Sequence, residues 1–377
     1  PLLFIPPWFY KCYILDLIPE KSLISWLVSR GHTVFVCSWV NPDERHAEKD
    51  FTDFMHEGAL FSIDAALKSA ETEKLDIVGY CVGGTLLAMT LAHMGKTGDD
   101  RINTATLLTA QVDFTHAGDL KLFVDNDQLV VLERKMRARG YLDGAAMASA
   151  FNMLRANDLI WPYVINNYIR GKDPFPFDLL YWNSDSTRMP AENHAFYLRK
   201  FYLENQFSKG VLEVAGQTIS PADIKVPVFN VATKDDHIAP ALSGYKGNAM
   251  FGAGANFVLT GSGLSAGIVN PPRKSTNSGP TATPPTISTT GLRRPRRPPA
   301  HGGRCGTTGW WKTVRERTFR QGHRAASTSM RRRTPRAATI GSDTNGQRGP
   351  LDETPHRGTI GVFTLTASDP LRNRRPF

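Results

Sequence analysis

The sequence is poor in cysteine and has no long uninterrupted apolar run. Its four cysteines, Cys12, Cys37, Cys81 and Cys305, show neither CxxC spacing nor a histidine cluster, so the sequence predicts no zinc site, no other metal site and no disulfide framework. A reducing, cytoplasmic setting is the expected one. The apolar opening, residues 2–17, is broken by two prolines, a lysine and an aspartate, which makes it too short and too polar to span a bilayer.

Basic residues are scarce in the first 272 positions, although the formal net charge of the chain is +10. Residues 273–377 hold 21 of the 45 Lys and Arg but only 5 of the 35 Asp and Glu, which leaves 24 against 30 for the rest. A mildly acidic body does not favour nucleic-acid binding, and the basic tail lacks the aromatic spacing of a nucleic-acid-binding module. We therefore expect no nucleic-acid partner and a disordered tail over residues 273–377.

Strands and helices alternate along the first part of the chain, in the order expected of a parallel sheet. The strands are near-continuous apolar runs, which indicates burial on both faces of the sheet. The predicted strands are residues 2–5, 32–39, 75–78 and 104–109, and the predicted helices are residues 20–29, 51–70 and 84–94.

This regular alternation ends near residue 112. Residues 113–222 show an irregular, helical pattern rich in aromatic side chains, and strands resume at 226–231 and 256–259. An α/β core interrupted by a long insertion before its last strands predicts an α/β-hydrolase fold with a helical cap. The chain then divides into a first core part (1–112), a cap or lid insertion (113–222), a second core part (223–272) and the tail (273–377).

The most informative motif is Gly79-Tyr80-Cys81-Val82-Gly83, between a predicted strand and a predicted helix. Gly-x-Cys-x-Gly at such a turn is typical of a nucleophile elbow. The tight turn strains the backbone of the nucleophile, and the flanking glycines let strand and helix pass without a clash. We expect the helix N-terminus to favour the Cys81 thiolate and the Val82 amide to hold an oxyanion. A buried structural cysteine in a glycine-rich turn is the alternative.

The order of residues along the chain tests this interpretation, because nucleophile, acid and histidine follow one another in this fold. Asp235-Asp236-His237 follows the strand 226–231, as the acid should. The histidine should come after the strand 256–259, but Leu264 stands at that place. None of the ten histidines is an obvious replacement, and His237 fits a polar contact beside the acid loop better than it fits a base.

Further motifs follow in order along residues 1–272. They are Pro6-Pro7-Trp8, Tyr13-Ile14-Leu15-Asp16-Leu17, Ser38-Trp39-Val40-Asn41-Pro42, Asn157-Asp158-Leu159-Ile160-Trp161, Pro176-Phe177-Asp178-Leu179-Leu180-Tyr181-Trp182-Asn183, Tyr197-Leu198-Arg199, Lys234-Asp235-Asp236-His237-Ile238-Ala239-Pro240 and Gly267-Ile268-Val269-Asn270-Pro271-Pro272. Together with the elbow, these motifs resemble those of the class I polyhydroxyalkanoate synthases.

The resemblance implies a role for each candidate site residue. Cys81 would be the nucleophile and Asp236 the triad carboxylate. Leu264 would occupy the position of the base, because residues 262–267 read Ser-Gly-Leu-Ser-Ala-Gly where the family pattern is Ser-Gly-His-Ile-Ala-Gly. The second oxyanion donor stays unassigned, because Phe9-Tyr10 stands where the family usually has an Asn.

The activity implied by the resemblance is polymerisation of (R)-3-hydroxyacyl-CoA thioesters, most simply 3-hydroxybutyryl-CoA, by covalent catalysis at Cys81 with release of CoA. It also implies a homodimer, located in the cytoplasm at polyester granules with granule-associated proteins as partners, and no cofactor apart from the CoA carried by the substrate. A thiol nucleophile suits a thioester substrate, because thiol-to-thioester exchange costs little free energy. Two alternatives are a thioesterase or lactone hydrolase with the same elbow, and a catalytically dead synthase-like protein.

Both ends of the chain depart from the family pattern. The chain has no initiator methionine and opens directly in a strand-like run, which indicates a fragment lacking its upstream part. At the other end, the His-Ile of the family pattern becomes Leu264-Ser265 if the gene loses one nucleotide and gains another shortly after. The resemblance to the family stops at Pro272. We therefore predict a frame slip near Arg273, with a genuine disordered basic tail as the alternative.

Overall fold

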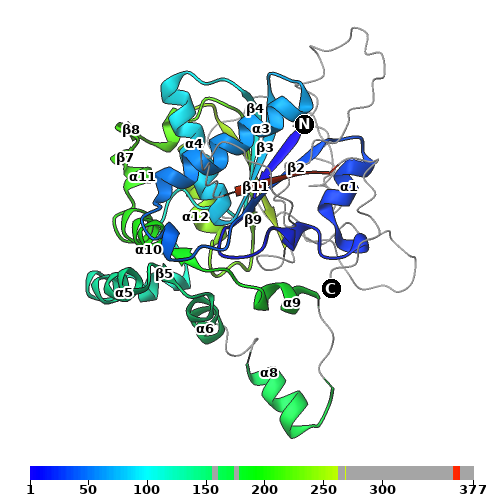
Figure 1. Ribbon diagram of the computed structural model, residues 1–377, viewed down its shortest axis with the longest axis vertical. Coiled ribbons are helices and arrows are strands. Elements are labelled where there is room, and N and C mark those ends of the chain that lie inside the picture. The colour runs from blue at the N-terminus through cyan, green and yellow to red at the C-terminus, as the bar shows by residue number, and fades with distance from the viewer. Residues whose placement is uncertain (155–159, 174–177, 262–267, 269–359, 366–377) are drawn as a thin grey trace, which may run out of the picture.

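The computed structural model describes residues 1–154, 160–173, 178–261, 268 and 360–365 (Figure 1). Its centre is a seven-stranded sheet in the order β10-β9-β4-β3-β1-β2-β11, in which the first six strands are parallel. The strands are β1 (Leu2–Ile5), β2 (Val34–Trp39), β3 (Leu75–Tyr80), β4 (Ile102–Leu108), β9 (Val228–Thr233), β10 (Ala255–Thr260) and β11 (Ile360–Leu365). All six strands predicted from the sequence are present, with ends shifted by a few residues.

Helices pack on both faces of the sheet because the strands are apolar on both sides. In β1, Leu3 and Ile5 belong to one buried cluster and Leu2 and Phe4 to another, as the two-residue period of a strand requires. Helix α1 (Leu23–Ser29) contributes to the second cluster, whereas α3 (Phe61–Ala70) and α4 (Val82–Thr97) contribute to the first. The predicted helix 51–70 is present as α2 (Phe51–Asp53), a π-helical turn η4 (Phe54–Leu60) and α3.

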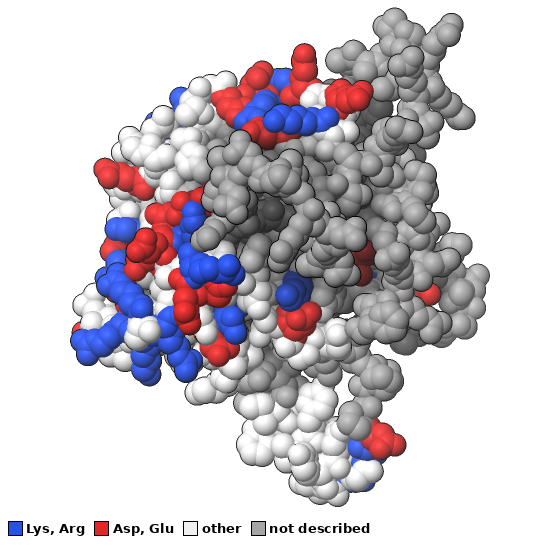
Figure 2. All heavy atoms as spheres, viewed as in Figure 1, with Lys and Arg blue, Asp and Glu red and all other residues white. Residues whose placement is uncertain are grey.

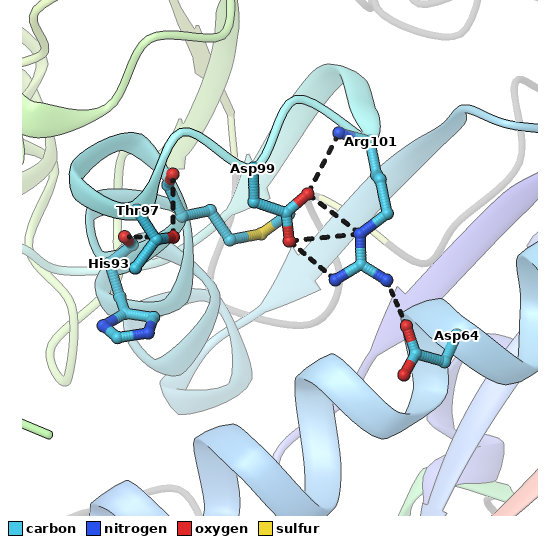
Figure 3. Close-up of polar contacts among 6 residues, drawn as sticks. Asp64, His93, Thr97, Asp99 and Arg101 are labelled. Carbon is cyan, nitrogen blue, oxygen red and sulfur yellow. Dashed lines mark hydrogen bonds and ion pairs between the residues drawn. The ribbon is translucent and has the colours of Figure 1, made fainter.

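The far end of α4 is fixed to the rest of the core by one arginine (Figure 3). Arg101 donates from Nε to Asp99 Oδ1 at 2.8 Å and from Nη2 to Asp99 Oδ2 at 2.6 Å, and its Nη1 contacts Asp64 of α3. Asp99 follows the end of α4 and Arg101 precedes β4, so the guanidinium joins three elements of the core. This contact helps to hold α4, and hence the turn at its N-terminus, in a fixed position.

The insertion is mostly helical, as predicted, and lies along one side of the core (Figure 1). It also contains two small antiparallel sheets that the sequence did not indicate, β5-β6 and β7-β8. Its elements are α5 (Asn126–Arg139), β5 (Tyr141–Leu142), α6 (Gly144–Leu154), α8 (Trp161–Tyr163), η6 (Val164–Ile169), α9 (Asp178–Ser184), β6 (Met189–Pro190), α10 (Ala191–Phe196), η7 (Tyr197–Leu203), α11 (Gln206–Lys209), β7 (Leu212–Val214) and β8 (Gln217–Ile219).

The tail contains one strand that the sequence analysis did not predict. Residues 360–365 pair antiparallel with β2, so that Val362 lies opposite Cys37. The segment Ile-Gly-Val-Phe-Thr-Leu is rich in β-branched and apolar residues, and β2 would otherwise offer an unpaired edge. Residues 269–359 and 366–377 lie outside the described residues, so their predicted disorder stays a prediction. Within the described part of the chain, no helix is both long enough and apolar enough to cross a membrane.

Candidate active site

Cys81 lies at the sharp turn between β3 and α4, as the elbow motif predicts. Its backbone has φ 54° and ψ −128°, a conformation that a residue with a side chain rarely adopts. The Cys81 N–H donates to the carbonyl of Leu108 in β4 at 2.9 Å, and the carbonyl of Cys81 accepts the N–H of Gly84 at 2.8 Å. Backbone bonds on both sides of the turn therefore hold the strained residue in place.

The glycines of the motif are required by close backbone contacts. A Cβ on Gly79 would lie 2.5 Å from the Cα of Gly84, and a Cβ on Gly84 would lie 2.5 Å from the Cβ of Ala110. A Cβ on Gly83 would overlap the carbonyl oxygen of Ile5 at the end of β1. Strand, turn and helix can approach this closely only without side chains at these positions, as the sequence analysis expected.

The environment of the Cys81 thiol combines the expected effect of the helix N-terminus with two stronger effects in the opposite direction. Burial and the nearby carboxyl group of Asp236 raise the pKa of Cys81 to about 12. The Val82 N–H hydrogen bond to the thiol lowers the pKa, but by less than the other two effects raise it. Removing the thiol from water and placing it near a carboxylate outweighs the partial charge of the helix end. The thiol therefore needs a base, and the Val82 N–H points toward it.

Asp236 lies in the loop after β9, and its environment distinguishes it from its neighbour. Its side chain is 5% exposed, whereas Asp235 is exposed. Asp236 Oδ1 accepts the backbone N–H groups of Ile238 at 2.9 Å and Ala239 at 2.8 Å. Burial nevertheless raises the pKa of Asp236 to about 6, because these two bonds and a smaller effect of the Thr233 side chain offset the loss of hydration only in part.

The second oxygen of Asp236 has a different environment from the first. Oδ2 is buried and has no hydrogen-bond partner among the described residues. The predicted base position, Leu264, lies within residues 262–267, outside the described residues. The strand before it, β10, ends at Thr260 beside β9, where Lys234 N–H donates to the carbonyl of Thr260 at 2.9 Å. The structure thus places the start of this loop next to the acid loop.

Three tyrosines near Cys81 were not assigned a role from the sequence. Burial raises the pKa of Tyr10, Tyr197 and Tyr202, and a charge on Cys81 raises each pKa further by a smaller amount. The hydroxyl groups of Tyr197 and Tyr202 are hydrogen-bonded to each other. Tyr197 and Tyr202 lie on the cap element η7, and Tyr10 follows β1, so no local pattern indicates that these residues meet near Cys81. Tyr197 belongs to the motif Tyr197-Leu198-Arg199, but only the folded structure shows that it lies near Cys81.

Metal binding finds no support in the part of the chain that the structure describes, where no group of three or more His, Cys, Asp or Glu side chains is arranged to hold an ion. The polar groups near Cys81 are one carboxyl group, phenol hydroxyls and backbone amides. These groups can bind and polarise a carbonyl compound and move protons.

Comparisons with known proteins agree with this geometry. Residues 9–262 match the model of the alpha/beta hydrolase fold family. The chain is 61% identical over 275 residues to the poly(3-hydroxyalkanoate) polymerase subunit PhaC of Rhizobium meliloti. This match covers 73% of the chain and 45% of that protein. It is 59% identical to the poly(3-hydroxyalkanoate) polymerase of Methylorubrum extorquens over 72% of this chain and 45% of that protein. The matching subunit of Cupriavidus necator is 39% identical over 74% of this chain and 48% of that protein.

These matches confirm the resemblance to polyhydroxyalkanoate synthases that the motifs predicted. In these three relatives the match spans less than half of the relative's length. The family model covers well over half of the chain, and the parallel sheet, the elbow and the acid loop stand in the order that this fold requires. The chain belongs to the alpha/beta hydrolase fold family.

Proposed function

We propose that this chain is the catalytic part of a polyhydroxyalkanoate synthase, an acyltransferase that joins 3-hydroxyacyl groups from CoA thioesters into a polyester. One observation carries the proposal: a cysteine, in place of the usual serine, occupies the strained elbow, with a buried aspartate in the loop after β9. The relatives named poly(3-hydroxyalkanoate) polymerases support it. Short-chain substrates, above all 3-hydroxybutyryl-CoA, are the ones we expect.

The first half-reaction loads the acyl group on Cys81. A base takes the thiol proton, the sulfur attacks the thioester carbonyl, and the Val82 N–H donates to the oxyanion that forms. The carbon–sulfur bond to CoA then breaks, and the CoA thiolate leaves with a proton from the base. Because the pKa of Cys81 is about 12, very little thiolate forms at neutral pH without a base.

The second half-reaction lengthens the polymer. The 3-hydroxyl group of another unit loses its proton to the base, and its oxygen attacks the Cys81 thioester. An ester bond forms as the carbon–sulfur bond breaks, and the released Cys81 thiolate takes the proton back from the base. Asp236 supports the base by orienting it and by stabilising its protonated form. A histidine at position 264 would supply that base. We therefore expect the chain with Leu264 to be nearly inactive.

The insertion supplies the surface for the proposed granule partner. Trp161, Ile165, Tyr168 and Ile169 of α8 and η6 are between 44% and 86% exposed. These elements protrude from the body (Figure 1), and Figure 2 shows the protrusion mostly uncharged, with acidic and basic side chains together on one side of its end. An uncharged aromatic surface fits an apolar polyester, whereas a mixed-charge surface does not. Dimerisation is a further proposal for the full-length protein.

We also propose that the protruding part of the insertion, residues 160–173, moves as a lid. Its exposed helices α8 and η6 contribute no fully buried side chain to the core. Backbone amides of residues 160–173 should therefore exchange hydrogen faster than those of β3 and β4. Slower exchange in the insertion than in the sheet would contradict a lid.

A cysteine hydrolase is the rival function, because a thioesterase or lactone hydrolase would use the same elbow. Product analysis separates the two. The Leu264→His protein, with the C-terminal reading frame restored, should convert 3-hydroxybutyryl-CoA into polymer and free CoA. Release of the free hydroxy acid without polymer would favour the hydrolase, and no CoA release at all would favour a catalytically dead protein.

A further inference from the structure

Tyr10 belongs to the segment that leaves β1 beside the nucleophile. The register pairs Ile5, the last residue of β1, with Gly79 of the elbow motif. The chain then continues through Pro6, whose carbonyl group a Cβ on Gly83 would overlap. Tyr10 is 7% exposed and lies in the buried cluster against which Cys81 packs. The Tyr10 side chain is also close enough to the nucleophile for a charge on Cys81 to act on the pKa of its hydroxyl group, after the larger effect of burial.

The cap helix α9 holds the Tyr10 ring in this position. Trp182 packs on it with a centroid distance of 4.3 Å, and the Tyr10 hydroxyl donates to Asn183 Oδ1 at 3.0 Å. Trp182 is itself fixed, because its Nε1–H donates to the carbonyl of Lys11 at 2.8 Å. On the other side, the Phe9 ring lies 5.1 Å from the Tyr10 ring, edge to face.

Further contacts bind the end of α9 to the same segment. The Tyr13 hydroxyl donates to Asp185 Oδ2 at 2.9 Å. The Thr187 hydroxyl donates to the carbonyl of Trp8 at 2.5 Å, and the Thr187 N–H donates to the carbonyl of Phe9 at 3.2 Å. This part of the cap is therefore fixed to the loop beside the elbow at several points, and Tyr10 has little freedom to swing away from Cys81.

We propose that Tyr10, supported by Trp182, limits the size of the acyl side chain that Cys81 can accept. A rigid aromatic pair at the site leaves space for a short group and excludes a longer one. The assignment of this group to the 3-substituent of a hydroxyacyl-CoA rests on the proposed function. The size limit itself is a property of the space beside Cys81 and can be tested without turnover.

The first test uses thiol reagents on the full chain. N-ethylmaleimide and N-hexylmaleimide react with Cys81 of the folded protein, and peptide mass spectrometry separates Cys81 from the other three cysteines. The urea-unfolded chain gives the intrinsic rate ratio of the two reagents. We expect the hexyl reagent to be disfavoured at folded Cys81 by at least about tenfold relative to that ratio, since a site of fixed size discriminates strongly against added methylenes.

Variants then assign the effect to Tyr10. Tyr10→Ala should bring the folded ratio close to the unfolded one, and Trp182→Phe should move it in the same direction. Tyr10→Phe keeps the ring and should keep the wild-type ratio. Tyr13→Phe, which removes a contact of α9 away from Cys81, is the matched control and should also keep it. Circular dichroism establishes that each variant is folded.

An unchanged ratio in both folded Tyr10→Ala and folded Trp182→Phe would overturn the proposal. A substrate test then links the size limit to the reaction. In the Leu264→His protein, Tyr10→Ala should increase loading of 3-hydroxyhexanoyl-CoA on Cys81 relative to 3-hydroxybutyryl-CoA. If neither substrate loads Cys81 while the maleimide selectivity is as expected, the proposed function fails and the size limit stands.

Discussion

The two halves of the candidate site differ in how they are built. The nucleophile half, at the turn from β3 to α4, is made of backbone: a strained Cys81, three glycines in close contact and backbone hydrogen bonds on both sides. The acid and base half depends on single side chains in loops. There Asp236 has one oxygen with two N–H donors and one with no partner among the described residues. A local motif preserves the first half, whereas we expect a single substitution at position 264 to be enough to disable the second.

Removing the nucleophile should have the largest effect on the reaction of any change in either half of the site. Cys81→Ala in the Leu264→His protein should abolish CoA release and polymer formation, because no other residue of the elbow motif carries a thiol. CoA release from 3-hydroxybutyryl-CoA, followed with a thiol-reactive dye, measures the effect. Turnover by the Ala variant would show that the nucleophile half has been assigned wrongly.

Restoring the base should give the next largest effect. Leu264→His should accelerate loading of Cys81 by roughly 10² to 10⁴, the range that general-base help contributes. Leu264→Asn, which adds a polar group without a base of suitable pKa, is the control and should stay near the original rate. Equal rates for the two variants would mean that the site does not depend on a base at position 264.

The protonated thiol predicts a steep pH profile in the original chain. Because burial and Asp236 raise the pKa of Cys81 to about 12, alkylation of Cys81 by iodoacetamide should rise by about tenfold per pH unit from neutral pH upward, in proportion to the thiolate fraction. The rate should show no plateau below pH 9. A plateau between pH 7 and 9 would mean that the helix end does stabilise the thiolate.

Asp236→Asn should stabilise the fold while harming the reaction. Burial raises the pKa of Asp236 in the folded protein to about 6 from the ordinary value of 3.8, so the native state holds this proton more tightly than the unfolded state. Stability is therefore lost as the pH rises between these values and stays lower above them, by about 1–3 kcal/mol. Asn cannot ionise, so the Asp236→Asn protein should have a higher free energy of unfolding than the original protein at pH 8. At pH 4 the two proteins should not differ in this free energy.

Urea unfolding at the two pH values measures this difference, with Asp235→Asn as the matched control. Asp235 is exposed, so its replacement should change little at either pH. A similar pH-dependent gain in both variants, or none in Asp236→Asn, would contradict the buried, poorly hydrated environment of Asp236.

The sequence predicted the parts of this molecule that depend on local patterns. Apolar runs of four to eight residues identified the parallel strands. Gly79, Cys81 and Gly83 identified the turn, because close backbone contacts demand glycine on both sides of the nucleophile. The order of the chain placed Asp236 after β9 correctly.

Features that depend on distant contacts could not be predicted in this way. The pKa of Cys81 depends on burial and on a carboxyl group 155 positions further along the chain. Tyr10 contacts Trp182 and Asn183 across the fold, and β11 pairs with β2 from the far end of the sequence. Local pattern carries no information on such pairs. The partial charge of the helix end, which the local motif does predict, lowers the pKa of Cys81 by less than burial and Asp236 raise it.

The central claim is that Cys81 carries the acyl group during the reaction. Peptide mass spectrometry of the Leu264→His protein, quenched in acid after incubation with 3-hydroxybutyryl-CoA, tests it directly. The account predicts hydroxybutyryl groups on the peptide that contains Cys81, none on the other cysteine peptides, and no adduct in the Cys81→Ala protein. CoA release without any adduct on Cys81, or an adduct on another residue, would contradict it.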